Sequence, residues 1–310
     1  MRHLVLDLDL AMGTPGSDID DGFALAVALG DPTVTVDLVT TVNGNTDVET
    51  ATALTLELLR RLEREDVPVH RGAAGPLLRT SSRKGTVPAD LAARAPQPGI
   101  AAVVLVEHVL AHPGEITLVA VGPLTNVALA LRLHPEFAAS LGALVIMGGV
   151  YGGHTHRADM PGEFNVWSDP EAAQIVLTSG VRARWVGLDV TQQVLMTRAE
   201  ALELAASERP FASFAGEHTV AWIDHLHEGR QDPGDSCPLH DPLAVVAVLQ
   251  PELLMWRDAY VQVELGDRAR GVMVTDYDRA GSGLTANAQI AVAVNAAAAR
   301  ELILARIGEH

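Results

Sequence analysis

Residues 4–29 of the chain, LVLDLDLAMGTPGSDIDDGFALAVAL, decide the fold. The stretch begins with a short apolar run at 4–9, which is typical of a buried strand. It ends with residues 20–29, whose apolar side chains have helical spacing and are followed by Gly30, a residue type that often stands just after a helix. A strand followed by a helix is the repeating unit of α/β proteins, so this stretch predicts that class.

The same alternation of strand and helix continues along the chain. Further strands are predicted at 34–42, 68–71, 116–121, 143–147 and 183–188, and further helices at 48–65, 100–111, 125–133 and 170–178. Strands that alternate with helices in this way form a mostly parallel central sheet with helices on both faces. The predicted fold class is therefore α/β with such a sheet at its centre.

The C-terminal third is predicted to add extra helices to this sheet. Helical patterns lie at 199–207, 211–227 and 242–249, a late pair of strands at 260–265 and 271–276, and a closing helix at 288–307. The least regular stretch, 79–99, contains three prolines and is a candidate for a long loop or lid. Neither a tandem repeat nor a linker-like segment interrupts the pattern, so we predict a single domain over residues 1–310.

Composition excludes several classes of protein. The chain has 310 residues, of which 48% are hydrophobic and 20% charged, and this balance predicts a folded core rather than disorder. A formal net charge of −17 argues against binding to nucleic acid or to anionic membranes. The one cysteine, Cys237, cannot form an intrachain disulfide, and the sequence contains neither a signal-peptide pattern nor an apolar run of about 20 residues. We therefore expect a cytoplasmic protein.

Five carboxylates gather around the first predicted strand and helix, at Asp7, Asp9, Asp18, Asp20 and Asp21. Ligands of open α/β sheets bind beyond the carboxyl ends of the strands, which is where these residues fall. Helix capping accounts for one or two of them, but so many like charges repel one another unless a cation is present. Oxygen ligands favour Ca²⁺ or Mg²⁺, so the cluster predicts a site for one of these metals.

The strand-borne sequence Asp7-Leu8-Asp9 leaves a second class of enzyme open. It resembles the haloacid-dehalogenase phosphohydrolases, in which the first aspartate is a nucleophile and Mg²⁺ is required. That family also uses a downstream lysine, and Lys84 is the only lysine of this chain. An Asp-x-Asp type, Mg²⁺-dependent phosphohydrolase therefore remains an alternative function.

Six further motifs follow the predicted strands in order along nearly the whole chain. They are TTVNGN at 40–45, VGPLTN at 121–126, MGG at 147–149, EFNVWSDPEA at 163–172, GLDVT at 187–191 and PLHDPLA at 238–244. Any one of them is a common turn sequence, but together they resemble the inosine–uridine-preferring nucleoside hydrolases. This resemblance implies an enzyme that hydrolyses the N-glycosidic bond of ribonucleosides to free base and ribose, as part of nucleoside salvage.

The resemblance also implies a role for individual residues. It implies one Ca²⁺ as the cofactor, with ligands from Asp9, Asp21, Asp241 and the backbone carbonyl of Thr125. It implies ribose binding by Asp20, Asn45, Glu163 and Asn165, and support of the cluster by Asp7. Asp9 would activate a Ca²⁺-bound water, and His240 would protonate the leaving base. The implied partners are a small nucleoside substrate and other copies of the chain, in a homodimer or homotetramer.

The chain departs from the family pattern mainly where a base or a ribose end would be contacted. Leu8 replaces a usual threonine, and the turn at 10–18 is lengthened. Arg157 stands where an asparagine is common, and Gln192 stands where a histidine is frequent. The preferred base therefore stays open, and a non-catalytic Ca²⁺- or ribose-binding protein on the same scaffold is a third hypothesis.

Overall fold

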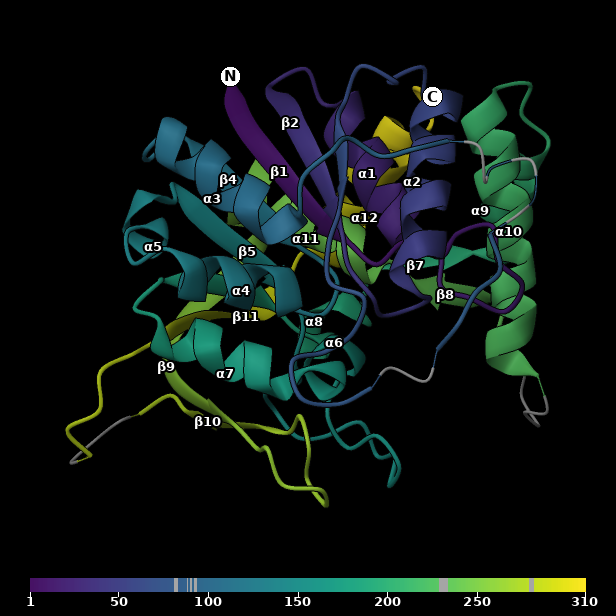
Figure 1. The fold of residues 1–310 in the computed structure, drawn as a ribbon. Helices are drawn as coiled ribbons and strands as arrows, with labels where there is room; N and C mark the ends of the chain where they lie inside the picture. The colour runs from purple at the N-terminus through teal and green to yellow at the C-terminus, as the bar shows by residue number, and fades with distance from the viewer. Residues whose placement is uncertain (81–82, 88, 90, 92–93, 229–233, 279–281) are drawn as a thin grey trace.

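The computed structural model describes residues 1–80, 83–87, 89, 91, 94–228, 234–278 and 282–310 (Figure 1). Within these residues, nine strands form one central sheet in the order β10-β9-β11-β6-β5-β4-β1-β2-β3. The strands are β1 (Arg2–Leu8), β2 (Val34–Thr41), β3 (Val69–Arg71), β4 (Ile116–Ala120), β5 (Ala143–Met147), β6 (Ala183–Val186), β9 (Leu254–Val263), β10 (Met273–Asp276) and β11 (Ala288–Val294). Seven of them, from β3 to β11, run parallel, and β9 runs antiparallel to both of its neighbours.

Helices cover both faces of this sheet. They are α1 (Asp20–Gly30), α2 (Val48–Arg61), α3 (Ala101–Ala111), α4 (Thr125–Leu133), α5 (Phe137–Ser140), α6 (Phe164–Ser168), α7 (Pro170–Thr178), α8 (Leu188–Thr191), α9 (Arg198–Ala205), α10 (Pro210–His227), α11 (His240–Leu249) and α12 (Ala296–Ile307). The helices α3, α4 and α7 lie on one face and α1, α2, α11 and α12 on the other (Figure 1). The predicted fold class, including the extra helices of the C-terminal third, is thus confirmed.

Alternation along β1 explains why both faces are covered. Leu4, Leu6 and Leu8 belong to the apolar core that contains Phe23 of α1, whereas Val5 belongs to the core on the opposite face. Successive side chains of a strand point to opposite faces, so a strand that is apolar at both sets of positions must be buried between two layers. The first strand is therefore held in the interior of the sheet, between β4 and β2.

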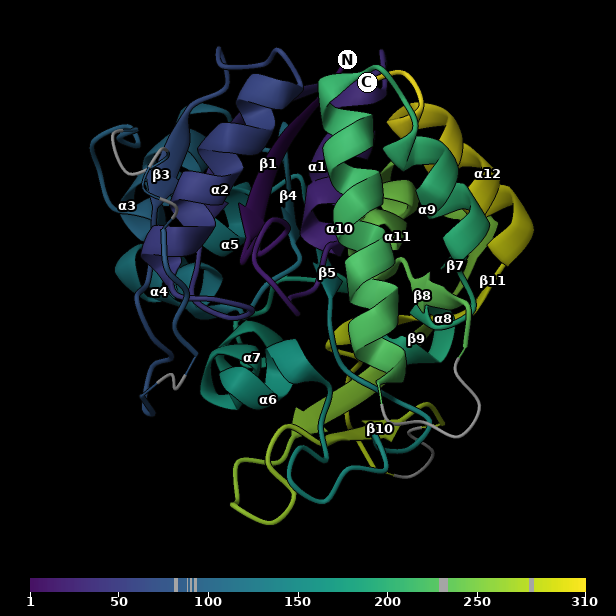
Figure 2. The ribbon, with the colours of Figure 1, turned by 90° about the vertical axis from the view of Figure 1, so that its right-hand side faces the viewer.

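Helices α9 and α10 pack against each other on the outer side of the molecule, and α10 lies in front of α1 and α11 in Figure 2. A two-stranded antiparallel sheet of β7 (Leu195–Thr197) and β8 (Ser236–Pro238) connects this part of the chain to the start of α11. The backbone N–H of Leu239 donates to the carbonyl of Val194 at 2.8 Å, which anchors the residues just before α11. None of the helices in the described ranges is long and apolar enough to cross a membrane.

The prediction of one closing helix over 288–307 is wrong. Residues Ala288–Val294 form the strand β11, and the helix α12 begins only at Ala296, after Asn295 has capped it by accepting a hydrogen bond from the N–H of Ala298. The alanine-rich sequence favours a helix, but β11 is inserted between β6 and β9 and pairs with both. This non-local pairing outweighs the local preference.

Other differences concern the ends of elements. Strand β9 begins at Leu254, six residues before its predicted start, and the short helices α5, α6 and α8 and the strands β7 and β8 were not predicted. Part of the predicted loop at 79–99, including Pro88, lies outside the described residues. In its described part, the N–H of Gly85 donates to the side chain of Asp47, the N-cap residue of α2.

The strand assignment of β11 predicts unequal losses of stability for two neighbouring side chains. Ile290 is fully buried, whereas Val292, on the same strand, is only partly buried. Ile290→Ala should lower the free energy of unfolding by about 2–5 kcal/mol, because it removes buried methyl groups and leaves a cavity. Val292→Ala should cost less, and urea unfolding measures both. A loss at Val292 equal to that at Ile290 would contradict the assignment.

Candidate active site

The polar residues of the candidate site lie where three adjacent strands end. Asp9 directly follows β1, Asn45 lies in the loop after β2, and Thr125 begins α4 in the connection after β4. Strand β1 lies between β2 and β4 and is parallel to both, so the three carboxyl ends meet at the same edge of the sheet. This is the edge at which open α/β sheets bind ligands.

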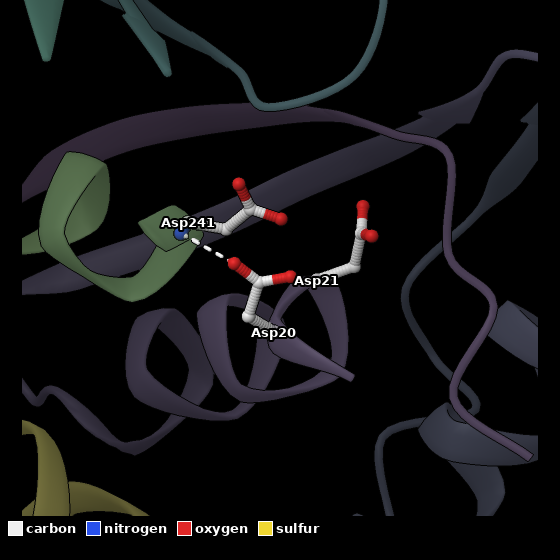
Figure 3. Close-up of side chains that lie close together, drawn as sticks. All are labelled: Asp20, Asp21 and Asp241. Atoms are coloured by element: carbon white, nitrogen blue, oxygen red, sulfur yellow. Dashed lines mark hydrogen bonds between the residues drawn. The ribbon is translucent and has the colours of Figure 1, made fainter. Parts of the chain in front are cut away.

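Three buried carboxylates meet beside these strand ends (Figure 3). Asp20 and Asp21 are the first two residues of α1, and Asp241 is the second residue of α11. One oxygen from each lies within 4.8 Å of the others, and the backbone N–H of Asp241 donates to Asp20 at 3.0 Å. The site therefore joins the N-termini of two helices that are far apart in sequence.

Asp9 lies outside this group of three but is bound to it. Its backbone N–H donates to the Asp21 carboxylate at 3.0 Å, and its own Oδ2 accepts from the backbone N–H of Asn45 at 2.7 Å. Its Oδ1 is buried and has no hydrogen-bond partner among the described residues. A buried carboxylate oxygen without a donor is costly, unless a cation binds it.

Two glycines allow the backbone to close around Asp9. A Cβ atom added to Gly44 would lie 1.9 Å from Oδ2 of Asp9, and one added to Gly122 would lie 2.8 Å from Oδ1. Any side chain at either position would overlap the carboxylate. Close approach of the Asp9 carboxylate thus explains why glycine stands at positions 44 and 122 in two of the sequence motifs.

The electrostatics of the cluster favour a bound cation. Burial raises the pKa of Asp9 to about 8, and the charge of Asp20 adds to this effect. Burial and a neighbouring carboxylate also raise the pKa of Asp20 to about 6 and hold the pKa values of Asp21 and Asp241 well above the ordinary range. A divalent cation would reverse these shifts, and a donor set made only of oxygen atoms fits Ca²⁺ or Mg²⁺.

Thr125 could contribute to such a site only through its backbone. Its hydroxyl donates to the side chain of Asp169 at 2.7 Å and is therefore already engaged. Its predicted role as a ligand depends on the main-chain carbonyl, as the family resemblance implies.

Asp7 is hydrogen-bonded by residues outside the cluster. Its Oδ1 accepts hydrogen bonds from Thr40 at 2.6 Å and from Asn126 at 2.8 Å, and its pKa is raised to about 6 by burial. A buried aspartate in this setting supports neighbouring loops, and a nucleophilic role in a phosphohydrolase is not favoured.

A cavity of about 270 Å³ lies beside Asp20 and Asp241, and we call it the carboxylate cavity. Its lining includes six of the predicted site residues, namely Asp20, Asn45, Glu163, Asn165, His240 and Asp241. Leu188 and Gln192 line it near the end where His240 lies, because α8 contacts α11 there. The structure thus brings together residues that are up to 221 positions apart in sequence, whereas Asp9, Asp21 and Thr125 do not line this cavity.

Glu163 and Asn165 are held rigidly at one wall of this cavity. The Glu163 carboxylate caps α6 by accepting from the backbone N–H groups of Asn165 and Val166, and it also accepts from Gly149 at 2.9 Å. The side-chain amide of Asn165 donates to the carbonyl of Val121 at 2.6 Å. Because backbone groups hold both side chains, a ligand meets them in one preset orientation.

His240 is held by a residue that the sequence analysis did not single out. Its Nδ1 lies 2.7 Å from the hydroxyl of Thr191, the last residue of α8. Burial lowers the pKa of His240, and the negative charge of Asp18 acts in the opposite direction. Thr191 belongs to the GLDVT motif, so the sequence indicated that this segment matters. Only the tertiary structure shows that the partner of Thr191 is His240.

A parallel sheet with an oxygen-only carboxylate cluster at its carboxyl edge defines an α/β enzyme whose site can hold a divalent cation. The model of the inosine-uridine preferring nucleoside hydrolase family matches residues 4–301 of the chain. The chain therefore belongs to this family, and it is a nucleoside hydrolase, an enzyme that acts on N-glycosyl bonds.

Individual relatives agree with this assignment. The non-specific ribonucleoside hydrolase RihC of Salmonella enteritidis is 36% identical over 303 residues, covering 94% of this chain and 93% of the relative. A plant nucleoside hydrolase superposes with a TM-score of 0.89 at 29% identity, covering 99% of this chain and 98% of its own. A purine-preferring ribonucleoside hydrolase from Gardnerella vaginalis has a TM-score of 0.86 at 27% identity, with the same coverage.

The raised pKa values predict how the metal-free protein responds to pH. Because Asp9 has a pKa of about 8 when folded, against 3.8 ordinarily, the folded protein binds more protons than the unfolded chain between these values. The free energy of unfolding of chelated protein should therefore fall as the pH rises from about 6.5 to 8. Asp9→Asn should flatten this dependence, as should added Ca²⁺, and urea unfolding at each pH measures it. Equal slopes for the wild type and Asp9→Asn would contradict the electrostatic account.

Proposed function

We propose that this enzyme hydrolyses the N-glycosidic bond of ribonucleosides to free base and ribose. The observation that carries the proposal is a single cavity with buried carboxylates on its floor and a histidine at one end. The carboxylates would stabilise the ribosyl ring, which becomes positive in the transition state. The histidine would protonate the departing base, which otherwise becomes negative. The names of the ribonucleoside hydrolases among the relatives support the same substrate class.

The proposed cofactor is one Ca²⁺ held by Asp9, Asp21, Asp241 and the backbone carbonyl of Thr125. The unpartnered Oδ1 of Asp9 and the proximity of Asp21 to Asp241 support this set. When bound, such a cation supplies Lewis acidity that lowers the pKa of water and fixes its position. It would also hold the neighbouring carboxyl groups in their ionised form at neutral pH.

The chain's own residues then provide the base and the ribose contacts. Asp9, ionised and fixed by the N–H of Asn45, accepts the proton of the attacking water. The ribose hydroxyls bind to Asp20, Asn45, Glu163 and Asn165. Asp20 and Glu163 carry negative charge when ionised, so they stabilise the cationic ring of the transition state more than the neutral substrate.

His240 is the proposed general acid for the leaving base. The contact between its Nδ1 and Thr191 leaves Nε2 as the ring nitrogen that serves the substrate. Burial lowers the pKa of His240, so only part of the enzyme carries the imidazolium at neutral pH, and the charge of Asp18 increases that part. A general acid of this kind contributes about 10²–10⁴-fold to the rate.

Three further features belong to the proposal. Residence in the cytoplasm is supported by the lack of a possible disulfide, because the one cysteine, Cys237, is free and buried. A role in nucleoside salvage follows from the proposed products, which are a reusable base and ribose. A homodimer or homotetramer is proposed from the family resemblance.

The metal proposal predicts that activity and thermal stability are lost together. Exhaustive chelation should abolish turnover and lower the melting temperature, because Ca²⁺ binds only the folded state and at 100 times its Kd contributes about 2.7 kcal/mol. Re-addition of Ca²⁺ should restore both. In Asp241→Asn, the rise in melting temperature on adding Ca²⁺ should shrink or vanish. Full activity of a protein shown by elemental analysis to contain no metal would refute this part.

The role of His240 predicts a contrast between two leaving groups. His240→Ala should reduce kcat for inosine by about 10²–10⁴-fold, because the purine must be protonated as it departs. The loss should be far smaller with p-nitrophenyl riboside, whose phenolate departs without protonation. Both substrates share the ribose contacts and the attacking water, so they control for each other. Equal losses on both, with a lowered melting temperature, would mean that His240 serves packing instead.

A further inference from the structure

A second cavity of about 220 Å³ lies next to the carboxylate cavity. Four arginines line it, namely Arg79, Arg83, Arg157 and Arg270, and we call it the arginine cavity. The two cavities share Arg157, Met160 and Phe164 as a common wall. Four guanidinium groups around one space are unexpected in a chain with a net charge of −17.

The arginine cavity reaches the floor of the active site at Gly44. This glycine lines the arginine cavity, and a Cβ added to it would touch Oδ2 of Asp9. By contrast, Leu188, Gln192 and His240, which lie at the end proposed for the base, line only the carboxylate cavity. The arginine cavity therefore adjoins the ribose site on the side away from the base.

The four arginines differ in how far their charges are neutralised. Arg270 is buried and forms two 2.8 Å hydrogen bonds to Glu171, and Arg79 pairs with Asp267. Arg157 pairs with Asp159 at 2.9 Å, but both side chains are mostly exposed, so this pair is weak and exchangeable.

Arg83 differs from the other three. Its guanidinium lies 4.3 Å from the centre of the Phe164 ring, and among the described residues it forms no ion pair with an acidic side chain. The stacking fixes the guanidinium plane without using its N–H donors, which remain available to an anion. Phe164 directly follows Glu163, so Arg83 is held beside the wall proposed to bind ribose.

We propose that the arginine cavity binds a phosphate group on the 5′ oxygen of the ribose, so that the substrates include ribonucleoside 5′-monophosphates. In a nucleoside, C1′ carries the base and C4′ carries the 5′ carbon on the other side of the ring oxygen. A base near His240 therefore directs the 5′ substituent toward Arg83 and Arg157. Planar guanidinium groups match phosphate oxygens in pairs, which makes arginine suited to this ligand.

This inference rests on the proposed function and adds only the substrate class. Water adds to C1′, the bond from C1′ to the base nitrogen breaks, and the base takes up a proton from His240. The products are the free base and ribose 5-phosphate, and no other reactant is needed. Arg157, which stands where an asparagine is common in the family, thereby acquires a role.

The test compares nucleosides with their nucleotides in wild type and three variants. The variants are Arg83→Gln, Arg157→Gln and the control Lys84→Gln, whose side chain is exposed and does not line either cavity. For inosine, uridine and their 5′-monophosphates, kcat/KM is measured and expressed as the ratio of nucleotide to nucleoside. Arg83→Gln should lower this ratio by about 10- to 100-fold, chiefly through KM, because a charge-assisted contact to phosphate is lost. Arg157→Gln should lower it in the same direction, and Lys84→Gln should leave it unchanged.

A second measurement needs no variant. Ribose 5-phosphate should inhibit the wild type more tightly than ribose does, since it occupies both cavities. If nucleosides are cleaved but nucleotides are not, or if the ratio is the same in the wild type and both arginine variants, the inference is wrong while the proposed function stands. If neither class is cleaved, the proposed function is wrong and the inference is wrong with it.

Discussion

Repulsion among buried carboxylates is the constraint on which the rest of the site depends. Asp9, Asp20, Asp21 and Asp241 are all buried within one small region, and each raises the cost of ionising the others. Backbone N–H groups offset part of this cost, because those of Asp9, Asn45 and Asp241 donate to carboxylates of the cluster. The rest of this free-energy cost is offset by the burial of apolar side chains in the two layers that cover the sheet. A bound cation would lower the cost itself.

The order of the strands makes this concentration of charge feasible. Parallel neighbours β2, β1 and β4 end together, and the helices that follow them begin at the same edge, so N–H groups and positive helix ends point toward the carboxylates. The approach of the backbone is close enough that Gly44 and Gly122 admit no side chain. A site of this kind therefore needs both the acidic residues and the small ones.

The site is chemically asymmetric along its length. One end holds His240, whose ring is fixed by Thr191, and it is suited to a group that becomes negative and needs a proton. The floor is anionic and suits a ring that becomes positive. The other end leads toward Arg83 and Arg157, where a permanent anion would be stabilised. Under the proposed function, the separation of these three environments over two adjoining cavities favours one orientation of a nucleoside-like ligand.

Sequence by itself determined the alternation of strands and helices, the acidic cluster and the order of the motifs, because apolar periodicity and residue type are local properties. Residues 288–294 were misassigned since alanine content says nothing about pairing with β6 and β9. Only the tertiary structure decided that Thr191 holds His240, that Thr40 donates to Asp7 and that Arg83 stacks on Phe164. These contacts join residues 33 to 81 positions apart. Their formation depends on how whole layers pack around the sheet, which no local pattern encodes.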